Sequence, residues 1–249
     1  MANNIALAKK YVDLLDEVYR VNALTSILDS DMSLSRAGAN TNEIVIPKIS
    51  MDGLADYSRN SGYVSGDVAL SWETVKFNYE RGRMFTVDVM DDEETQNVAF
   101  GRLAGEFMRN KVVPEIDAFR FAQYAGTAGI STTAGADLAD GSAVLSAITA
   151  GMSKMDEDEV PQEGRILFIT PTLARMVEAL DTNKSREVLA GFSQIIRVPQ
   201  SRFYTAIDLY DGTTNGETAG GYVKNANAKN INFMIIEKSA LLQYTKHAV

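Results

Sequence analysis

The chain has 249 residues, 45% of them hydrophobic, with 24 basic and 33 acidic side chains and a formal net charge of −9. This apolar content is enough for one large domain or two modest ones and excludes a disordered chain. The acidic balance argues against a surface that grips phosphate backbones, and the absence of cysteine excludes disulfide frameworks, thiolate nucleophiles and sulfur-ligated zinc. No stretch has the pattern of a signal peptide or a membrane span, so we expect a soluble, unexported protein without a membrane partner.

Residues 5–28 place apolar side chains at helical spacing, with most charged side chains on another face. This pattern predicts an amphipathic helix, which is either an ordinary packed helix or an arm that binds a partner. The stretch that follows, DSDMSLSRAGANTN, is polar and rich in turn-forming residues. We therefore predict an N-terminal helix and arm over residues 1–42.

Residues 43–51, EIVIPKISM, predict a strand, and Pro47 suits the edge of a sheet. The stretch after it, DGLADYSRNSGYVSGDVALS, has few large apolar residues, and a loop of about 20 residues without its own core is unusual inside a compact domain. The simplest interpretation is a two-stranded arm with a flexible tip. Because an isolated hairpin is marginally stable in water, something else must order it.

Apolar and polar side chains alternate from residue 75 to residue 89, which is the period of a strand with one wet face. A single strand of this length would reach about 50 Å, whereas a compact chain of this size is only about 45 Å across. The alternative is two strands joined at a bulge at Gly82. We predict an extended loop, in the form of a long hairpin, and an adjoining strand over residues 43–90.

Asp91 and Glu94 follow this alternating run with the spacing of a capping box. Carboxylates are also favoured at the positive end of a helix dipole, so we interpret them as a helix cap and not as a catalytic pair. Pro114 either kinks the helix that follows or begins a second one. The prediction is a long helix over residues 91–125.

The small-residue stretch over residues 126–142 marks a predicted domain boundary. Beyond it, residues 143–155 predict a helix, RILFI a buried strand, and TPTLARMVEAL a helix capped by Thr170. Further strands are predicted over residues 193–198, 202–210, 230–236 and 240–245, and Asn215-Gly216 predicts a turn. The second half is therefore an α/β or α+β unit.

No motif in the chain supports catalysis. The single histidine is His247, and the glycines of GTAGISTTAG are not followed by the lysine of a phosphate loop. DTNKSREVLAGF begins like a calcium loop, but Arg186 stands where glycine is needed and Phe192 where the closing glutamate belongs. We predict no catalytic residue, no cofactor and no metal site, and we do not expect an enzyme.

The order of these parts resembles the major capsid proteins of tailed double-stranded DNA bacteriophages, whose Hong Kong 97-type fold is shared by encapsulin shells. The stretch IPKISMDGLADYSRNSGYVSGDVALSWETVKFNYERGRMFTVDVMDDEET is similar to the extended loop of one branch of that family. VVPEIDAFRFAQYAG resembles the long peripheral-domain helix that follows the loop. The resemblance covers most of residues 40–125 and is thinner over residues 126–249.

This resemblance implies an α+β fold of the Hong Kong 97 type, with an axial α/β domain over residues 126–230 and C-terminal strands returning to the peripheral domain over residues 231–249. It implies a structural protein that assembles into pentamers and hexamers of an icosahedral phage head, which encloses double-stranded DNA without sequence-specific binding. The extended loop would lie across a neighbouring subunit. The implied contact residues are Leu54, Tyr57, Arg59, Tyr63, Trp72, Arg81 and Arg83.

The resemblance also implies a location in the virion, after assembly in the host cytoplasm with a portal and with or without a decoration protein. Because the arm begins at Met1, we expect a separate scaffolding protein, and the chain ends at QYTKHAV where related proteins usually continue through another strand. Two alternatives remain open. One is an encapsulin-like compartment with protein cargo, and the other is an α/β enzyme in which RILFITPTLARMVEAL forms one strand–helix unit.

Overall fold

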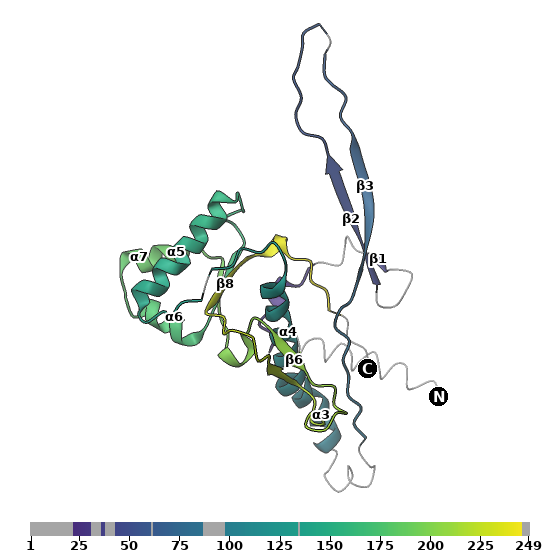
Figure 1. The fold of residues 1–249 in the computed structure, drawn as a ribbon, viewed down its shortest axis with the longest axis vertical. Helices are drawn as coiled ribbons and strands as arrows, with labels where there is room; N and C mark the ends of the chain where they lie inside the picture. The colour runs from purple at the N-terminus through teal and green to yellow at the C-terminus, as the bar shows by residue number, and fades with distance from the viewer. Residues whose placement is uncertain are drawn as a thin grey trace. The chain divides into compact units, whose positions relative to one another are not determined.

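The computed structural model describes residues 22–30, 36–37, 43–60, 62–86, 98–133 and 135–245. Helices and strands are mixed along the chain, which confirms the α+β class (Figure 1). The chain divides into two compact units, one made of Met1–Asp29 with Val87–Val249 and the other of Ser30–Thr86. We call the first the body unit and the second the hairpin unit. This division is coarser than the five predicted parts, whose boundaries stay predictions.

The hairpin unit is a three-stranded antiparallel sheet in the order β1 (Arg36–Ala37), β2 (Glu43–Met51) and β3 (Val68–Lys76) (Figure 1). Glu43 pairs with Lys76 at one end of the β2–β3 ladder and Met51 pairs with Val68 at the other. The two nine-residue strands are thus in register over their whole length. The predicted strand over residues 43–51 and its pairing with a second strand are confirmed; that the pair extends from the body as an arm stays a prediction.

The predicted strand over residues 75–89 is confirmed only at Val75 and Lys76 and is wrong over residues 77–86. β3 ends at Lys76, and residues 77–86 form no strand. The alternative of two strands joined at Gly82 is wrong as well, because Gly82 lies outside the ladder and has no positive φ. Among the described residues the β2–β3 ladder ends at the pair Glu43–Lys76, and residues 77–86 pair with no described strand. Residues 87–97, with Asp91 and Glu94, lie outside the described residues.

The body unit begins its long helix with α3 (Val98–Phe107), which passes through a π-helical turn (Met108–Val112) into α4 (Val113–Gly126). Pro114 stands at the start of α4, where the missing N–H costs little. The helical chain therefore runs on from α3 into α4, with Pro114 as the second residue of α4; whether the helix is kinked there stays a prediction. The π-helical turn before the proline joins the two segments.

The sheet of the body unit has β4 (Arg165–Ile169) at its centre, with β5 (Gln194–Arg197) parallel to it and β8 (Phe233–Glu237) antiparallel to it. Every residue of β4 is buried, because alternate side chains enter two different apolar clusters. Leu167 and Ile169 pack with the helices after residue 140, whereas Ile166 and Phe168 pack with α4. The prediction of RILFI as a buried strand is confirmed.

Three helices supply one of these clusters: α5 (Gly141–Glu157), α6 (Pro171–Glu178) and α7 (Asn183–Ala190) (Figure 1). The first two confirm the predicted helices. Thr170 stands at the N-cap of α6, although its side chain makes no capping hydrogen bond. α7 was not predicted, and it starts with a capping box in which the Thr182 and Ser185 side chains bond each other's backbone N–H.

The predicted strands of the last third are confirmed only in part. The strand predicted over residues 193–198 is β5, and that over residues 230–236 overlaps β8. The run predicted over residues 202–210 forms a 3₁₀ turn (Gln200–Arg202) and the short β6 (Ile207–Leu209), which pairs with β7 (Tyr222–Lys224). Gly216, in the loop between them, has a φ of +91°, which confirms the predicted turn.

Two predictions at the ends of the chain are corrected. Residues 240–245 form no strand, because a 3₁₀ turn (Lys238–Ala240) is followed by irregular chain whose side chains bond other segments. The predicted helix over residues 5–28 is described only from residue 22, and there a 3₁₀ turn (Ser26–Leu28) stands in place of a regular helix. The earlier residues of that helix, and His247, lie outside the described residues.

The close approach of α5 to α6 at Gly141 gives a testable prediction. A Cβ at Gly141 would lie 2.2 Å from the carbonyl oxygen of Met176, so Gly141→Ala forces the two helices apart. We expect a loss of about 1 to 3 kcal/mol in the free energy of unfolding, measured by chemical denaturation. Gly105→Ala in α3 is the control, because its Cβ meets nothing within 4 Å. A gain of about 0.5 to 1 kcal/mol is expected there, and equal effects of the two variants would contradict the prediction.

Candidate interaction surface on the hairpin

The two faces of the β2–β3 hairpin differ in chemistry. Side chains that pair across an antiparallel ladder project from the same face of the sheet. The pairs Pro47–Trp72, Ile49–Leu70 and Met51–Val68 therefore share one face, which we call the apolar face. Five of its side chains are exposed, with relative accessibilities of 61% (Ile49), 71% (Met51), 73% (Val68), 59% (Leu70) and 46% (Trp72).

The opposite face, which we call the polar face, is polar around its middle, where Lys48, Ser71 and Glu73 lie, and apolar at the Ile44–Val75 end of the ladder. Lys48 forms an ion pair with Glu73 at 3.9 Å, and the Ser71 hydroxyl donates to the carbonyl of Lys48 at 3.4 Å. These exposed pairs contribute little to stability, but they give the charged groups partners within the hairpin. The two faces thus differ most along residues 47–51 and 68–72, where one face carries paired polar groups and the other leaves large apolar side chains in water.

The tip of the hairpin, residues 52–67, has turn structure of its own. At its base the N–H of Asp52 donates to the carbonyl of Asp67 at 3.2 Å, and the N–H of Asp67 donates to the Asp52 carboxylate at 2.8 Å. Near its end Ser58 and Gly62 exchange two backbone hydrogen bonds, of 3.3 and 2.7 Å. Gly62 has a φ of +74°, which favours glycine at this position. Local bonds therefore give the tip a defined shape.

Apolar side chains gather on this tip. The rings of Tyr57 and Tyr63 lie 4.9 Å apart at 45°, and both side chains are exposed, as is Leu54. Twelve of the sixteen exposed large hydrophobic side chains in the described part of the chain lie between Ile49 and Phe85. Concentrated apolar exposure of this kind marks a surface that binds another molecule.

The residues predicted as contacts fall on three parts of the hairpin unit. Leu54, Tyr57, Arg59 and Tyr63 lie on the tip, Trp72 lies on the apolar face, and Arg81 and Arg83 lie in the irregular segment after β3. All seven are exposed, and the structure brings Tyr57 and Tyr63 together. Whether they contact another subunit stays a prediction.

Four further members of the apolar face were missed from the sequence: Ile49, Met51, Val68 and Leu70. The signal was present as alternation within residues 45–51 and within residues 68–72. It could be used only once the two segments were paired in register, because the register decides which residues share a face.

Titratable groups in the body unit have structural roles. Hydrogen bonds from the Thr214 hydroxyl and from the N–H groups of Thr214 and Thr213 hold the pKa of Asp211 well below its usual range. These bonds order the loop between β6 and β7.

Within the described residues no group of three or more histidine, cysteine, aspartate or glutamate side chains is placed to hold a metal ion. In the same residues no helix is both long and apolar enough to span a membrane.

Comparison with family models, with curated proteins and with solved structures gives no match to this chain. The function must therefore be argued from the hairpin surface and from the resemblance that the sequence carries.

Proposed function

We propose that the chain is the major capsid protein of a tailed double-stranded DNA bacteriophage and self-assembles into pentamers and hexamers of an icosahedral head. One observation carries the proposal: the hairpin presents an exposed apolar face and an exposed aromatic tip. The Hong Kong 97-type fold and the extended-loop role of the hairpin belong to this proposal. They are supported by the order of the elements and by the similarity of the sequence of residues 46–95 to the extended loop of that family.

The energetics favour a partner over the apolar face. A two-stranded hairpin is marginally stable in water unless its apolar side is covered. Fully burying one large aliphatic or aromatic side chain contributes about 1.5 to 3 kcal/mol, and Ile49, Leu70 and Trp72 all stand on the same face. A partner that covered them would supply the stabilisation that the hairpin cannot obtain from its two strands.

The partner is a second copy of the same chain. A contact between one surface patch and a different patch on the next copy repeats around a ring and closes it, as pentamers and hexamers require. The formal charge of −9 suits a container that encloses DNA without binding its sequence. The proposal includes a location in the virion, assembly in the host cytoplasm, a separate scaffolding protein, a portal, and reinforcement by a decoration protein in those phages that have one.

Electron microscopy of the purified full-length protein tests the proposal, together with sedimentation velocity. The expected result is rings and closed shells far larger than the 27.2 kDa chain. A homogeneous monomer or small oligomer under all conditions, including co-expression with a scaffolding protein, would contradict it. Shells that enclose a specific protein cargo and are never filled with DNA would favour the encapsulin-like alternative.

A further inference from the structure

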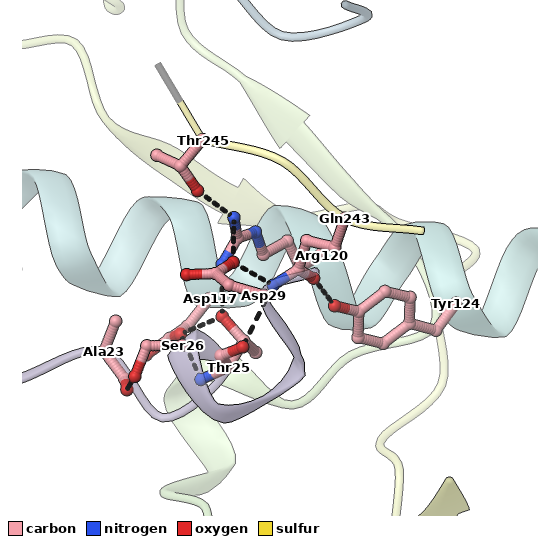
Figure 2. Close-up of polar contacts among 9 residues, drawn as sticks. All are labelled: Ala23, Thr25, Ser26, Asp29, Asp117, Arg120, Tyr124, Gln243 and Thr245. Carbon is pink, nitrogen blue, oxygen red and sulfur yellow. Dashed lines mark hydrogen bonds and ion pairs between the residues drawn. The ribbon is translucent and has the colours of Figure 1, made fainter. Parts of the chain in front are cut away.

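Thr25, just before the hairpin unit begins, is completely buried and uses every one of its polar groups (Figure 2). Its N–H and its hydroxyl donate to one carboxylate oxygen of Asp117, at 3.1 and 2.7 Å. The hydroxyl oxygen accepts from Arg120 at 3.0 Å, and the carbonyl accepts from Gln243 at 3.0 Å. One residue of the N-terminal segment is thus bonded both to α4 and to the C-terminal segment.

Asp117 is the carboxylate on which the N-terminal segment rests. It is fully buried, and it also accepts from the N–H of Leu24 at 3.2 Å and from the Arg202 guanidinium at 3.1 Å. Burial raises the pKa of Asp117, against the lowering effect of these hydrogen bonds. The Asp117 carboxylate accepts four hydrogen bonds. Losing any of these donors while the carboxylate stays buried costs free energy, so the contacts favour one defined arrangement.

The C-terminal segment contacts the same residues of the N-terminal segment and the same helix, α4 (Figure 2). The Gln243 amide donates to Asp29 at 2.6 Å as well as to Thr25, and it accepts from the hydroxyl of Tyr124 on α4. Arg120 donates to Thr245 at 2.5 Å and forms an ion pair with Asp29 at 3.1 Å. Gln243 therefore joins the C-terminal segment to the N-terminal segment and to α4, and Arg120 of α4 contacts both terminal segments.

Apolar packing joins the two segments in the same way. Leu28 of the N-terminal segment is fully buried in the cluster around Phe121, and Leu241 of the C-terminal segment packs against that cluster. Asp117 and Phe121 lie one helical turn apart, so the polar and apolar contacts occupy one face of α4. Loss of either segment would expose part of the surface on which the other rests.

We propose that residues 24–29 and 241–245 form a single clasp on α4, in which the two segments are held and released together. Asp29 is the last residue of the body unit, and the chain enters the hairpin unit at Ser30. The C-terminal segment therefore controls how firmly the chain leading to the hairpin is anchored. This coupling is independent of the proposed function, since it concerns contacts within one copy of the chain.

Hydrogen exchange of the full-length protein tests the clasp. Gln243→Leu removes the bonds to Thr25 and Asp29 and the acceptor of Tyr124, and it is expected to accelerate amide exchange at least tenfold in residues 24–29 as well as in residues 241–245. Thr25→Val is expected to accelerate exchange in the same two segments. In the double variant, the fold-increase in the exchange rate should be smaller than the product of the two single fold-increases. The reason is that the shared contacts are lost only once.

The matched control for Thr25→Val is Thr149→Val in α5, which also removes a threonine hydroxyl, here one that donates to the carbonyl of Leu145 at 2.8 Å. Its effect should stay local and leave residues 24–29 unchanged. If Gln243→Leu unfolds the whole unit, Thr245→Val gives a milder perturbation through the single bond to Arg120. Acceleration confined to the mutated segment, or multiplicative effects in the double variant, would overturn the proposal.

Discussion

Leu70→Asp is expected to abolish shell assembly while the subunit stays folded, a result that rests on the proposed function. Leu70 stands on the apolar face opposite Ile49, and it is more than half exposed. Substitutions at exposed positions usually change the free energy of unfolding by less than about 0.5 kcal/mol. In an assembled shell, however, an unpaired carboxylate would be buried against the next copy, at a cost of several kcal/mol in each contact. Circular dichroism and electron microscopy measure the two effects separately.

The neighbouring position supplies the control, because it faces the other side of the same strand. Ser71→Asp introduces the same charge on the polar face, directly opposite Lys48. Shells of normal size are expected from this variant. The midpoint temperature of its thermal unfolding should be unchanged or slightly raised by the new ion pair with Lys48. Assembly by Leu70→Asp, or equal loss of assembly in both variants, would show that the apolar face is not the contact.

The tip of the hairpin makes a milder prediction within the same scheme. Joining Met51 to Val68 through Asn-Gly in place of residues 52–67 keeps the register, because Met51 and Val68 are already paired and Asn-Gly forms a two-residue hairpin turn. The variant loses Tyr57 and Tyr63 but keeps the apolar face. We expect a folded subunit whose shells dissociate at a lower denaturant concentration than the natural ones, as measured by sedimentation velocity.

Local signals in the sequence predict the elements that need only local partners. The apolar run RILFI is a buried strand, and Thr170-Pro171 begins a helix at the expected residue. The alternation over residues 75–89 did not give a strand over residues 77–86, because alternation alone does not supply a pairing partner, and the described β2–β3 ladder ends at Glu43–Lys76. The apolar run near residue 241 failed for a related reason: Leu241 and Gln243 are used in packing on α4 and not in a ladder.

The two surfaces described above differ in the same respect. The tip residues were predicted because the resemblance to the capsid family assigns the extended loop to one continuous stretch of sequence that contains them. Predicting the apolar face would have required the register of two strands. Predicting the clasp would have required contacts between residues far apart in the sequence: Thr25 and Asp117 are separated by 92 positions, and Thr25 and Gln243 by 218. No local pattern marks such pairs, because their chemistry is set by the tertiary packing.

Phe121→Ala is expected to give the largest loss of stability of any single substitution proposed for the body unit. The ring of Phe121 is fully buried, with centroids 4.9 Å from Phe203, 5.3 Å from Phe168 and 6.1 Å from Tyr124, all in edge-to-face geometry. Truncation of a buried phenylalanine costs about 3 to 5 kcal/mol, through lost burial and the cavity left behind. Each ring pair adds about 0.5 to 1.5 kcal/mol that is lost with the ring.

The expected loss is large compared with the total stability of a domain, about 5 to 15 kcal/mol, so the variant should unfold at a much lower denaturant concentration or accumulate as aggregate. Phe119→Ala is the control, because Phe119 lies on the same helix but is only partly buried. It should cost less than half as much. Since Phe121 joins α4 to β4 and to the N-terminal segment through Leu28, Phe121→Ala should also accelerate exchange in residues 24–29. An unfolding free energy equal to that of Phe119→Ala would show that the body unit has no single core at this ring cluster.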